Sequence, residues 1–293
     1  MPEIWEGPDP TIHRRRLRSE LRTAREACGK TQREVAAAMD WSASKLIRIE
    51  TGAVNISTND LRALLNHYEA DQDKIENLVR TARASREPPR WNIYRDVATP
   101  EYISFLGCES SASVIRNFEP LLIPGLLQTE EYARQVITAV EEPQKVDALV
   151  DLRTQRQEVL TRENPPDTHF ILDEAVISRI VGGPAVMRRQ VRHLQESSEQ
   201  SNITIRIMSF KIGMYPRLRV PYVIFEFPEP EDEDVMYIEN PTGELFIREN
   251  SPEERSEMTP VNYLGIFWQL EQIAASEETP DFLARIQDGL RDL

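Results

Sequence analysis

The sequence predicts two domains of different fold class, an all-α domain of five helices followed by a larger α+β domain with mixed α/β character. Three observations lead to this prediction. The chain has 293 residues, which is long for one domain. Apolar residues recur at helical spacing up to residue 86, whereas alternating runs typical of strands appear only further on. Between these regions lies Arg86-Glu-Pro-Pro-Arg90, whose prolines prevent a helix from continuing.

The composition argues against a membrane-spanning chain and favours a reducing compartment. Hydrophobic residues make up 40% of the sequence, enough for packed cores, but no run of about 18 apolar residues is present. The segment 1–10 lacks the basic and then apolar order of a signal peptide, and we expect a flexible tail there. Cys28 and Cys108 stand far apart, as expected of two reduced thiols. We therefore expect a cytoplasmic protein with no metal or cofactor.

Charge is distributed unevenly between the two predicted domains. The net charge of −14 by itself argues against nucleic acid as a partner. Residues 11–90, however, hold 16 Lys and Arg against 11 Asp and Glu, a balance of +5, and residues 91–293 hold 19 against 35, a balance of −16. Phosphate binding depends on the field within about one Debye length, roughly 8–10 Å, so the first domain alone can attract DNA.

The first domain is predicted over residues 11–86. Its helices are expected at 11–28, 31–39, 42–51, 57–68 and 71–86. The outer face of the first of these carries Arg14, Arg15, Arg16, Arg18 and Arg22. This run of arginines fits a solvated surface and a DNA-facing surface equally well.

The second and third of these helices are joined by a tight turn. Thr31, followed three residues later by Glu34, forms a capping box at the start of one helix. Ser42 is a good N-cap for the other, from which Leu46 and Ile49 point inward. Such a helix-turn-helix allows its second helix to lie in the major groove of DNA.

Residues 17–68 resemble the repressor/xenobiotic-response-element class of helix-turn-helix regulators. The matching residues are Thr31-Gln32, Val35-Ala36, Ser42-Ala43-Ser44, Leu46, Arg48-Ile49-Glu50, Gly52, Leu61 and Tyr68. The resemblance implies that Gln32 touches the DNA backbone and that Arg25 forms a structural ion pair with Glu50. It also implies that the major groove is faced by Ser42, Ala43, Ser44, Lys45 and Arg48. Asp40-Trp41 stands where the family often has glycine and a small residue, so Trp41 covers the turn or leans against the sugar-phosphate backbone.

The residue types at the start of the third helix point to the same base contacts. Short Ser and Ala side chains let the backbone approach the bases, so Lys45 or Arg48 can reach guanine O6 and N7. A bidentate contact of this kind discriminates between bases by roughly 1–3 kcal/mol. Two alternatives stay open: Arg48 pairs with a neighbouring carboxylate, or Lys45 faces phosphate or solvent.

The second domain is predicted over residues 101–293, after a linker at 87–100. Strands are expected at 113–118, 169–173, 203–208, 222–227, 235–239 and 244–247, and a core strand within 123–128. Helices are expected from 129, at 146–162, 174–181, 184–198, 256–275 and 280–293, and in part over 91–107, where Pro100 breaks the pattern.

The segment Ile123–Arg134, IPGLLQTEEYAR, resembles the signature of the C-terminal domain in actinomycete WhiJ-like regulators. Arg153-Thr-Gln-Arg156-Gln157, the Asp173-Glu174 corner and the strand at 236–240 agree with it. The resemblance implies a transcriptional regulator of development or secondary metabolism, frequently encoded beside a small acidic partner protein. It implies no known ligand or reaction.

The residues do not support catalysis. Asp173, Glu174, Glu226 and Glu239 fall at predicted strand ends, but carboxylates are common in so acidic a region. No HExxH, Gly-x-Ser-x-Gly, P-loop or GxGxxG motif is present. We expect no enzyme, and a hydrolase with a DNA-binding appendage is the most distant alternative.

Together these inferences predict a sequence-specific transcriptional regulator that binds double-stranded operator DNA as a homodimer through a recognition helix at 42–51. Residues beyond 91 are expected to supply dimerisation and to sense a small-molecule effector or a small acidic protein partner. The alternative is an antitoxin-like protein that mainly binds a small protein partner through its second domain.

Overall fold

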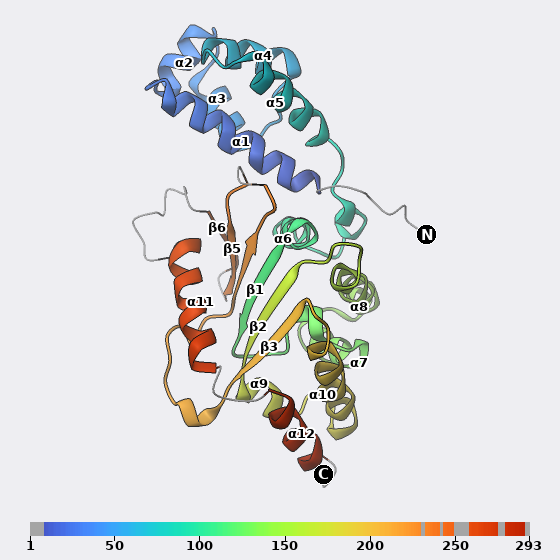
Figure 1. Cartoon of the computed structure of the whole chain (residues 1–293). Helices are drawn as coiled ribbons and strands as arrows, with labels where there is room; N and C mark the ends of the chain where they lie inside the picture. The colour runs from blue at the N-terminus through green and yellow to red at the C-terminus, as the bar shows by residue number, and fades with distance from the viewer. Residues whose placement is uncertain (1–8, 230–231, 241–242, 249–257, 275–278, 291–293) are drawn as a thin grey trace. The chain divides into compact units, whose positions relative to one another are not determined.

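The chain forms two compact units that divide between Asn92 and Ile93. The computed structural model describes residues 9–229, 232–240, 243–248, 258–274 and 279–290 (Figure 1). The first unit is built of helices and the second of a mixed sheet with helices, so the predicted fold class is confirmed. Most of the predicted tail at residues 1–10 lies outside the described residues. Asp9, however, caps the first helix, since its Oδ1 accepts a hydrogen bond from Thr11 N at 2.8 Å.

The first unit contains five α-helices around one apolar core. They are α1 (Pro10–Ala27), α2 (Gln32–Ala38), α3 (Ala43–Glu50), α4 (Thr58–His67) and α5 (Gln72–Ala84). The helix ends are fixed by side-chain caps from Thr31, Ser42, Ser57 and Asp71. The core draws on all five helices and includes Leu21, Val35, Leu46, Leu61, Leu64, Leu65 and Leu78.

One arginine of the run on α1, Arg14, does not lie on the outer face that its sequence suggests. Arg14 Nε donates to the carbonyl of Ser85 at 2.7 Å, and its Nη2 donates to the carbonyl of Glu87 at 2.9 Å. These are carbonyls left without helical partners at the end of α5. The prediction of a solvated or DNA-facing side chain is therefore wrong for Arg14, which ties α1 to the end of α5.

The second unit contains a six-stranded sheet within the described residues, in the order β3-β2-β1-β4-β5-β6. The strands are β1 (Val114–Glu119), β2 (Asp167–Asp173), β3 (Ile203–Met208), β4 (Tyr222–Glu226), β5 (Val235–Asn240) and β6 (Gly243–Arg248). Parallel pairing joins β1 to β2 and β2 to β3, and antiparallel pairing joins β1 to β4, β4 to β5 and β5 to β6. The helices are α6 (Pro100–Ser111), α7 (Glu130–Val140), α8 (Pro143–Arg156), α9 (Glu174–Ser178), α10 (Pro184–Ser198), α11 (Pro260–Ala274) and α12 (Thr279–Gly289). The 3-10 turns of this unit are η2 (Gly125–Leu127), η3 (Gln157–Leu160) and η4 (Phe210–Ile212), and a further one, η1 (Arg90–Tyr94), spans the division between the units.

Proline shapes two segments of this unit. The helical pattern predicted in part over 91–107 is interrupted before Pro100, as expected, and Pro100 begins α6 behind the Thr99 cap because the first helical position needs no backbone donor. The segment 123–128 is not a strand: Pro124 and Gly125 turn it into η2, although Leu126 and Leu127 are buried as a core segment requires.

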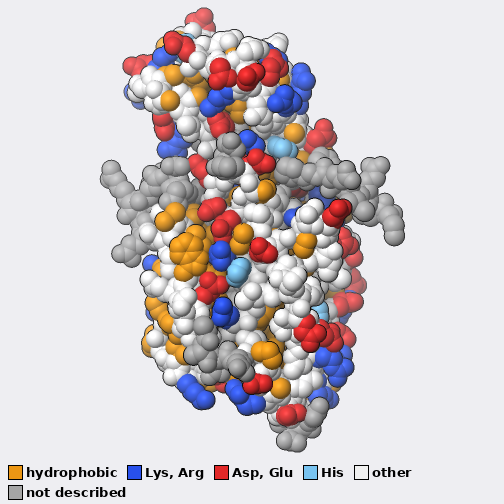
Figure 2. All heavy atoms as spheres, viewed as in Figure 1, with side chains coloured by type: hydrophobic (Ala, Val, Ile, Leu, Met, Phe, Trp, Pro, Cys, Tyr) orange, Lys and Arg blue, Asp and Glu red, His pale blue; other side chains and the backbone are white. Residues whose placement is uncertain are grey.

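Helices cover both faces of the sheet. On one face α11 packs Tyr263 and Phe267 onto a core that includes Phe118 and Ile224. On the other face α6 packs Phe105 against Phe225 and Tyr237, and α10 lies against β3 (Figure 1). Figure 2 shows charged side chains scattered over the visible face and hydrophobic ones gathered over α11. No helix in the described part of the chain is long and apolar enough to cross a membrane.

Candidate nucleic-acid interface

The turn between α2 and α3 is built around an aspartate in the left-handed conformation. Asp40 has φ of +54° and stands where the resemblance to helix-turn-helix regulators leads us to expect glycine. Aspartate tolerates this region better than most residues do. Trp41 N donates to the Ala36 carbonyl at 2.8 Å, and the Trp41 side chain packs against the core. Trp41 therefore covers the turn.

A buried ion pair fixes the far end of α3. Arg25 Nε of α1 donates to Glu50 Oε1 at 2.7 Å, and these side chains are only 11% and 3% exposed. Gln32 Nε2 of α2 donates to the other oxygen, Oε2, at 2.7 Å. Burial disfavours the charge on Arg25, but the hydrogen bond and the charge of Glu50 outweigh it and raise the pKa of the guanidinium. Because three helices meet at Glu50, the orientation of α3 is locked.

The outward face of α3 carries one apolar and several polar side chains. Ser44, Ile47, Arg48 and Thr51 are exposed at helical spacing, opposite the buried residues Leu46 and Ile49. Within the described part of the chain, the Arg48 guanidinium makes no ion pair or hydrogen bond, so it stands ready for an external acceptor. Ser42 and Ser44 are exposed and Ala43 is half-buried beside the core.

Lys45, the other predicted base contact, is engaged inside the unit. Its Nζ lies 3.0 Å from Asp60 Oδ2 of α4 and 3.8 Å above the ring of Trp41. An ion pair as exposed as this one is worth less than about 1 kcal/mol, so a phosphate can displace Asp60. The arrangement favours Arg48 over Lys45 for contact with a base.

Ile47 is the functional candidate that sequence reasoning missed. Its side chain is 42% exposed in the middle of the outward face of α3. The signal was present in the sequence, because a helix that buries Leu46 and Ile49 must turn residue 47 away from the core. An exposed apolar side chain on such a helix suits contact with the methyl group of thymine.

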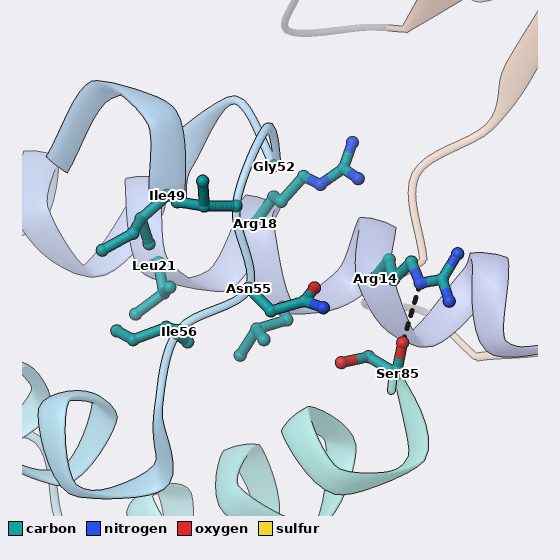
Figure 3. Close-up of a pocket in the computed structure, with 10 residues that line it drawn as sticks. Arg14, Arg18, Leu21, Ile49, Gly52, Asn55, Ile56 and Ser85 are labelled. Atoms are coloured by element: carbon teal, nitrogen blue, oxygen red, sulfur yellow. Dashed lines mark hydrogen bonds between the residues drawn. The ribbon is translucent and has the colours of Figure 1, made fainter. Parts of the chain in front are cut away.

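The hollow behind α3 is too small for an effector. It lies under the connection from α3 to α4 and is lined by residues that include Arg14, Arg18, Gly52, Asn55 and Ser85 (Figure 3). Its volume is about 20 Å³, room for a water molecule but far below the size of a small-molecule pocket. Gly52 has φ of +74°, and the Arg18 guanidinium lies so close that a Cβ at Gly52 would be 1.8 Å from Arg18 Nε.

The candidate carboxylates of the second unit have structural partners. Asp173 accepts hydrogen bonds from Ala175 N and from the Tyr215 hydroxyl. Glu174 accepts from Phe210 N at 2.7 Å, and Glu226 pairs with Arg116 at 2.7 Å. The Glu239 side chain lies outside the described residues. Across the described residues, no group of His, Cys, Asp and Glu side chains has an arrangement that could hold a metal ion.

The segments that resemble a regulator signature meet each other in the structure. Arg153 Nη1 donates to Gln128 Oε1 at 2.9 Å, and Gln157 Nε2 donates to the Gln128 carbonyl at 2.7 Å. Arg156 is buried and donates from Nε to Glu109 Oε1 at 2.8 Å. A Cβ at Gly125 would lie 2.9 Å from Arg153 Nη1, so glycine permits this close packing. The signature therefore holds 123–128 against α8 and η3.

Comparison with known proteins agrees with this division of the chain. Residues 16–78 match a family model described as a helix-turn-helix domain, which supports DNA binding by the first unit. No curated protein and no solved structure matches the chain. Residues 102–262 match the model of a domain of unknown function (DUF5753), and this match takes in more than half of the sequence. The chain therefore belongs to the DUF5753 family and carries a helix-turn-helix domain ahead of the family's own domain.

Proposed function

We propose that this protein is a sequence-specific transcriptional regulator that inserts α3 into the major groove of operator DNA. The observation that carries the proposal is the outward face of α3, where Ser44, Ile47 and Arg48 are exposed and the Arg48 guanidinium has no partner among the described residues. The lock at Glu50 supports it, since a helix that reads base edges must hold its orientation to within about 10–20°. Arg48 contacts guanine, and Gln32 and Lys45 approach the backbone.

The regulator binds as a homodimer. One module of this size makes few phosphate contacts and binds weakly, whereas two recognition helices about 34 Å apart reach successive major grooves on one side of the duplex. The second unit supplies the dimer contact and receives the signal, either a small-molecule effector or a small acidic protein partner. The similarity of 123–134 and 153–157 to WhiJ-like regulators supports this assignment. We infer further that the protein is cytoplasmic and has no enzymatic activity.

Selection of bound sequences from random DNA, followed by a salt titration, tests the proposal. A regulator binds one enriched fragment more tightly than bulk DNA at every salt concentration, while its affinity for both falls as salt rises. Equal affinity for the enriched and bulk fragments would refute sequence-specific binding. Co-purification of a small protein partner together with such indifference would favour the antitoxin-like alternative.

Two arginine variants locate the reading surface. Arg48→Ala should weaken binding to the selected fragment by roughly 1–3 kcal/mol and relax the preference at one base position. Arg83→Ala is the matched control, because Arg83 is exposed on α5 and its removal takes away the same charge. Equal losses for the two variants would mean that only the total charge matters and that α3 does not read the groove.

A further inference from the structure

The outward face of α3 offers one free charged side chain and one large apolar side chain to DNA. The exposed residues of this face are Ser44, Ile47, Arg48 and Thr51. Thr51 Oγ1 donates to the Ile47 carbonyl at 2.9 Å, so its hydroxyl hydrogen is already used inside the helix. A serine such as Ser44 can pair with more than one base and adds little preference. The base preference of this face therefore depends on Arg48 and Ile47.

The chemistry of Arg48 selects guanine. Its guanidinium makes no ion pair or hydrogen bond in the described part of the chain, so its donors are open to a base. Guanine presents two acceptors, O6 and N7, which match two parallel N–H groups of a guanidinium. Adenine presents N7 beside the N6 donor, and this donor opposes one N–H group of the arginine. Guanine is therefore the base that satisfies Arg48.

The chemistry of Ile47 selects thymine. Its side chain is 42% exposed and holds no polar atom. The methyl group of thymine is the apolar group that base edges offer in the major groove. Against guanine or cytosine, the isoleucine would remove polar groups of the base from water without a hydrogen bond in return, which costs free energy. Ile47 therefore favours an A·T pair.

The two side chains belong to consecutive residues, and this spacing decides where their bases lie. Consecutive Cα atoms are about 3.8 Å apart, close to the step of about 3.4 Å between base pairs and well short of two steps. Guanine pairs with cytosine and thymine with adenine, so the two contacts fall on different base pairs. Glu50 locks the orientation of α3, so both side chains approach the groove together. Adjacent base pairs meet both conditions.

We propose that each operator half-site carries a G·C pair directly beside an A·T pair, with Arg48 on the guanine and Ile47 on the thymine methyl group. The other base pairs under α3 contribute little to the preference of this helix. In the dimer the same two base pairs recur in inverted orientation about 34 Å away. The inference rests on the proposed function, because it names the bases that the recognition helix reads.

Selection of bound sequences from random DNA, by the full chain and by its variants, tests the inference. The wild type should enrich a guanine and a thymine on neighbouring base pairs. Ile47→Ala should lower the preference at the thymine position about 4-fold, the factor that corresponds to one buried methylene group. The guanine position should keep its preference in this variant, because Arg48 is unchanged.

A second variant gives a result that a folding defect cannot produce. Glutamine pairs with N6 and N7 of adenine, so Arg48→Gln should lose the preference for guanine, ~5-fold or more, and select adenine at the same position. The thymine position should stay as in the wild type. Arg83→Gln is the matched control, since Arg83 is exposed on α5, outside the reading helix, and this variant should keep both preferences.

The outcomes separate this inference from the proposed function. A wild-type chain that enriches no sequence overturns both. An enriched sequence overturns the base assignment alone if the positions altered by Ile47→Ala and Arg48→Gln are not adjacent. Guanine that persists in the Arg48→Gln selection does the same, and leaves a regulator that reads its operator with other side chains.

Discussion

The ion pair between Arg25 and Glu50 should contribute far more to the stability of the first unit than an equally short pair on its surface. The comparison is Arg62 with Glu76, where the contact distance is also 2.7 Å. The Glu50 side chain is 3% exposed and the Glu76 side chain 45% exposed, so the two pairs differ chiefly in burial. Removing one partner of a buried pair costs about 3–5 kcal/mol, because the other charge stays buried without compensation. Loss of an exposed pair costs about 0–1 kcal/mol.

We therefore expect Glu50→Gln to lower the free energy of unfolding by about 3 kcal/mol. This value is the low end of the range for buried pairs, because the Arg25 side chain retains 11% exposure. Glu76→Gln should cost much less, because both partners of that pair are exposed and water screens their charges. Urea unfolding of a fragment ending at Asn92, followed by helical circular dichroism, measures both, since the core of this unit lies within residues 17–82. Equal costs for the two variants would refute the argument that burial at Glu50 holds α3 in place.

Three further predictions concern the first unit. Ile47→Ala should weaken operator binding, because it removes the exposed apolar side chain of α3. Replacing one thymine of the operator by uracil removes the methyl group, and should weaken binding of the wild type but not of the variant. A double-mutant cycle over protein and operator measures this coupling. Burial, followed by the nearby charge of Arg16, lowers the pKa of His13 below its ordinary value of 6.5. The stability that neutral His13 contributes is therefore present above pH 6.5 and is lost as the pH falls below that value. His13→Gln should make the free energy of unfolding in urea less dependent on pH over this range. Gly52→Ala should destabilise the unit more than Gly29→Ala in thermal unfolding, because both have positive φ but only Gly52 lies against a side chain, that of Arg18.

Much of the first unit follows from its sequence because its signals are local. The capping box at Thr31, the cap at Ser42 and the apolar spacing of Leu46 and Ile49 each act within one helical turn. The structure has hydrogen bonds at both caps, and the helix bounds agree with the predicted ones to within a few residues. Arg14 shows where such local signals fail, since its acceptor at Ser85 lies 71 residues away in sequence.

In the second unit the unforeseen features depend on pairings between distant residues. The burial of Arg156 depends on Glu109, 47 residues earlier in the chain, and a charged residue on an amphipathic pattern gives no sign of such a partner. The role of Gly125 depends on Arg153, which the fold brings against it.

The uneven charge of the chain reconciles its overall acidity with the proposed binding to DNA. The first unit, with a local balance near +5, can approach phosphates despite a total of −14. Residues 91–293, with a balance of −16, are repelled by phosphates, so the protein can approach DNA closely only on the side of the first unit.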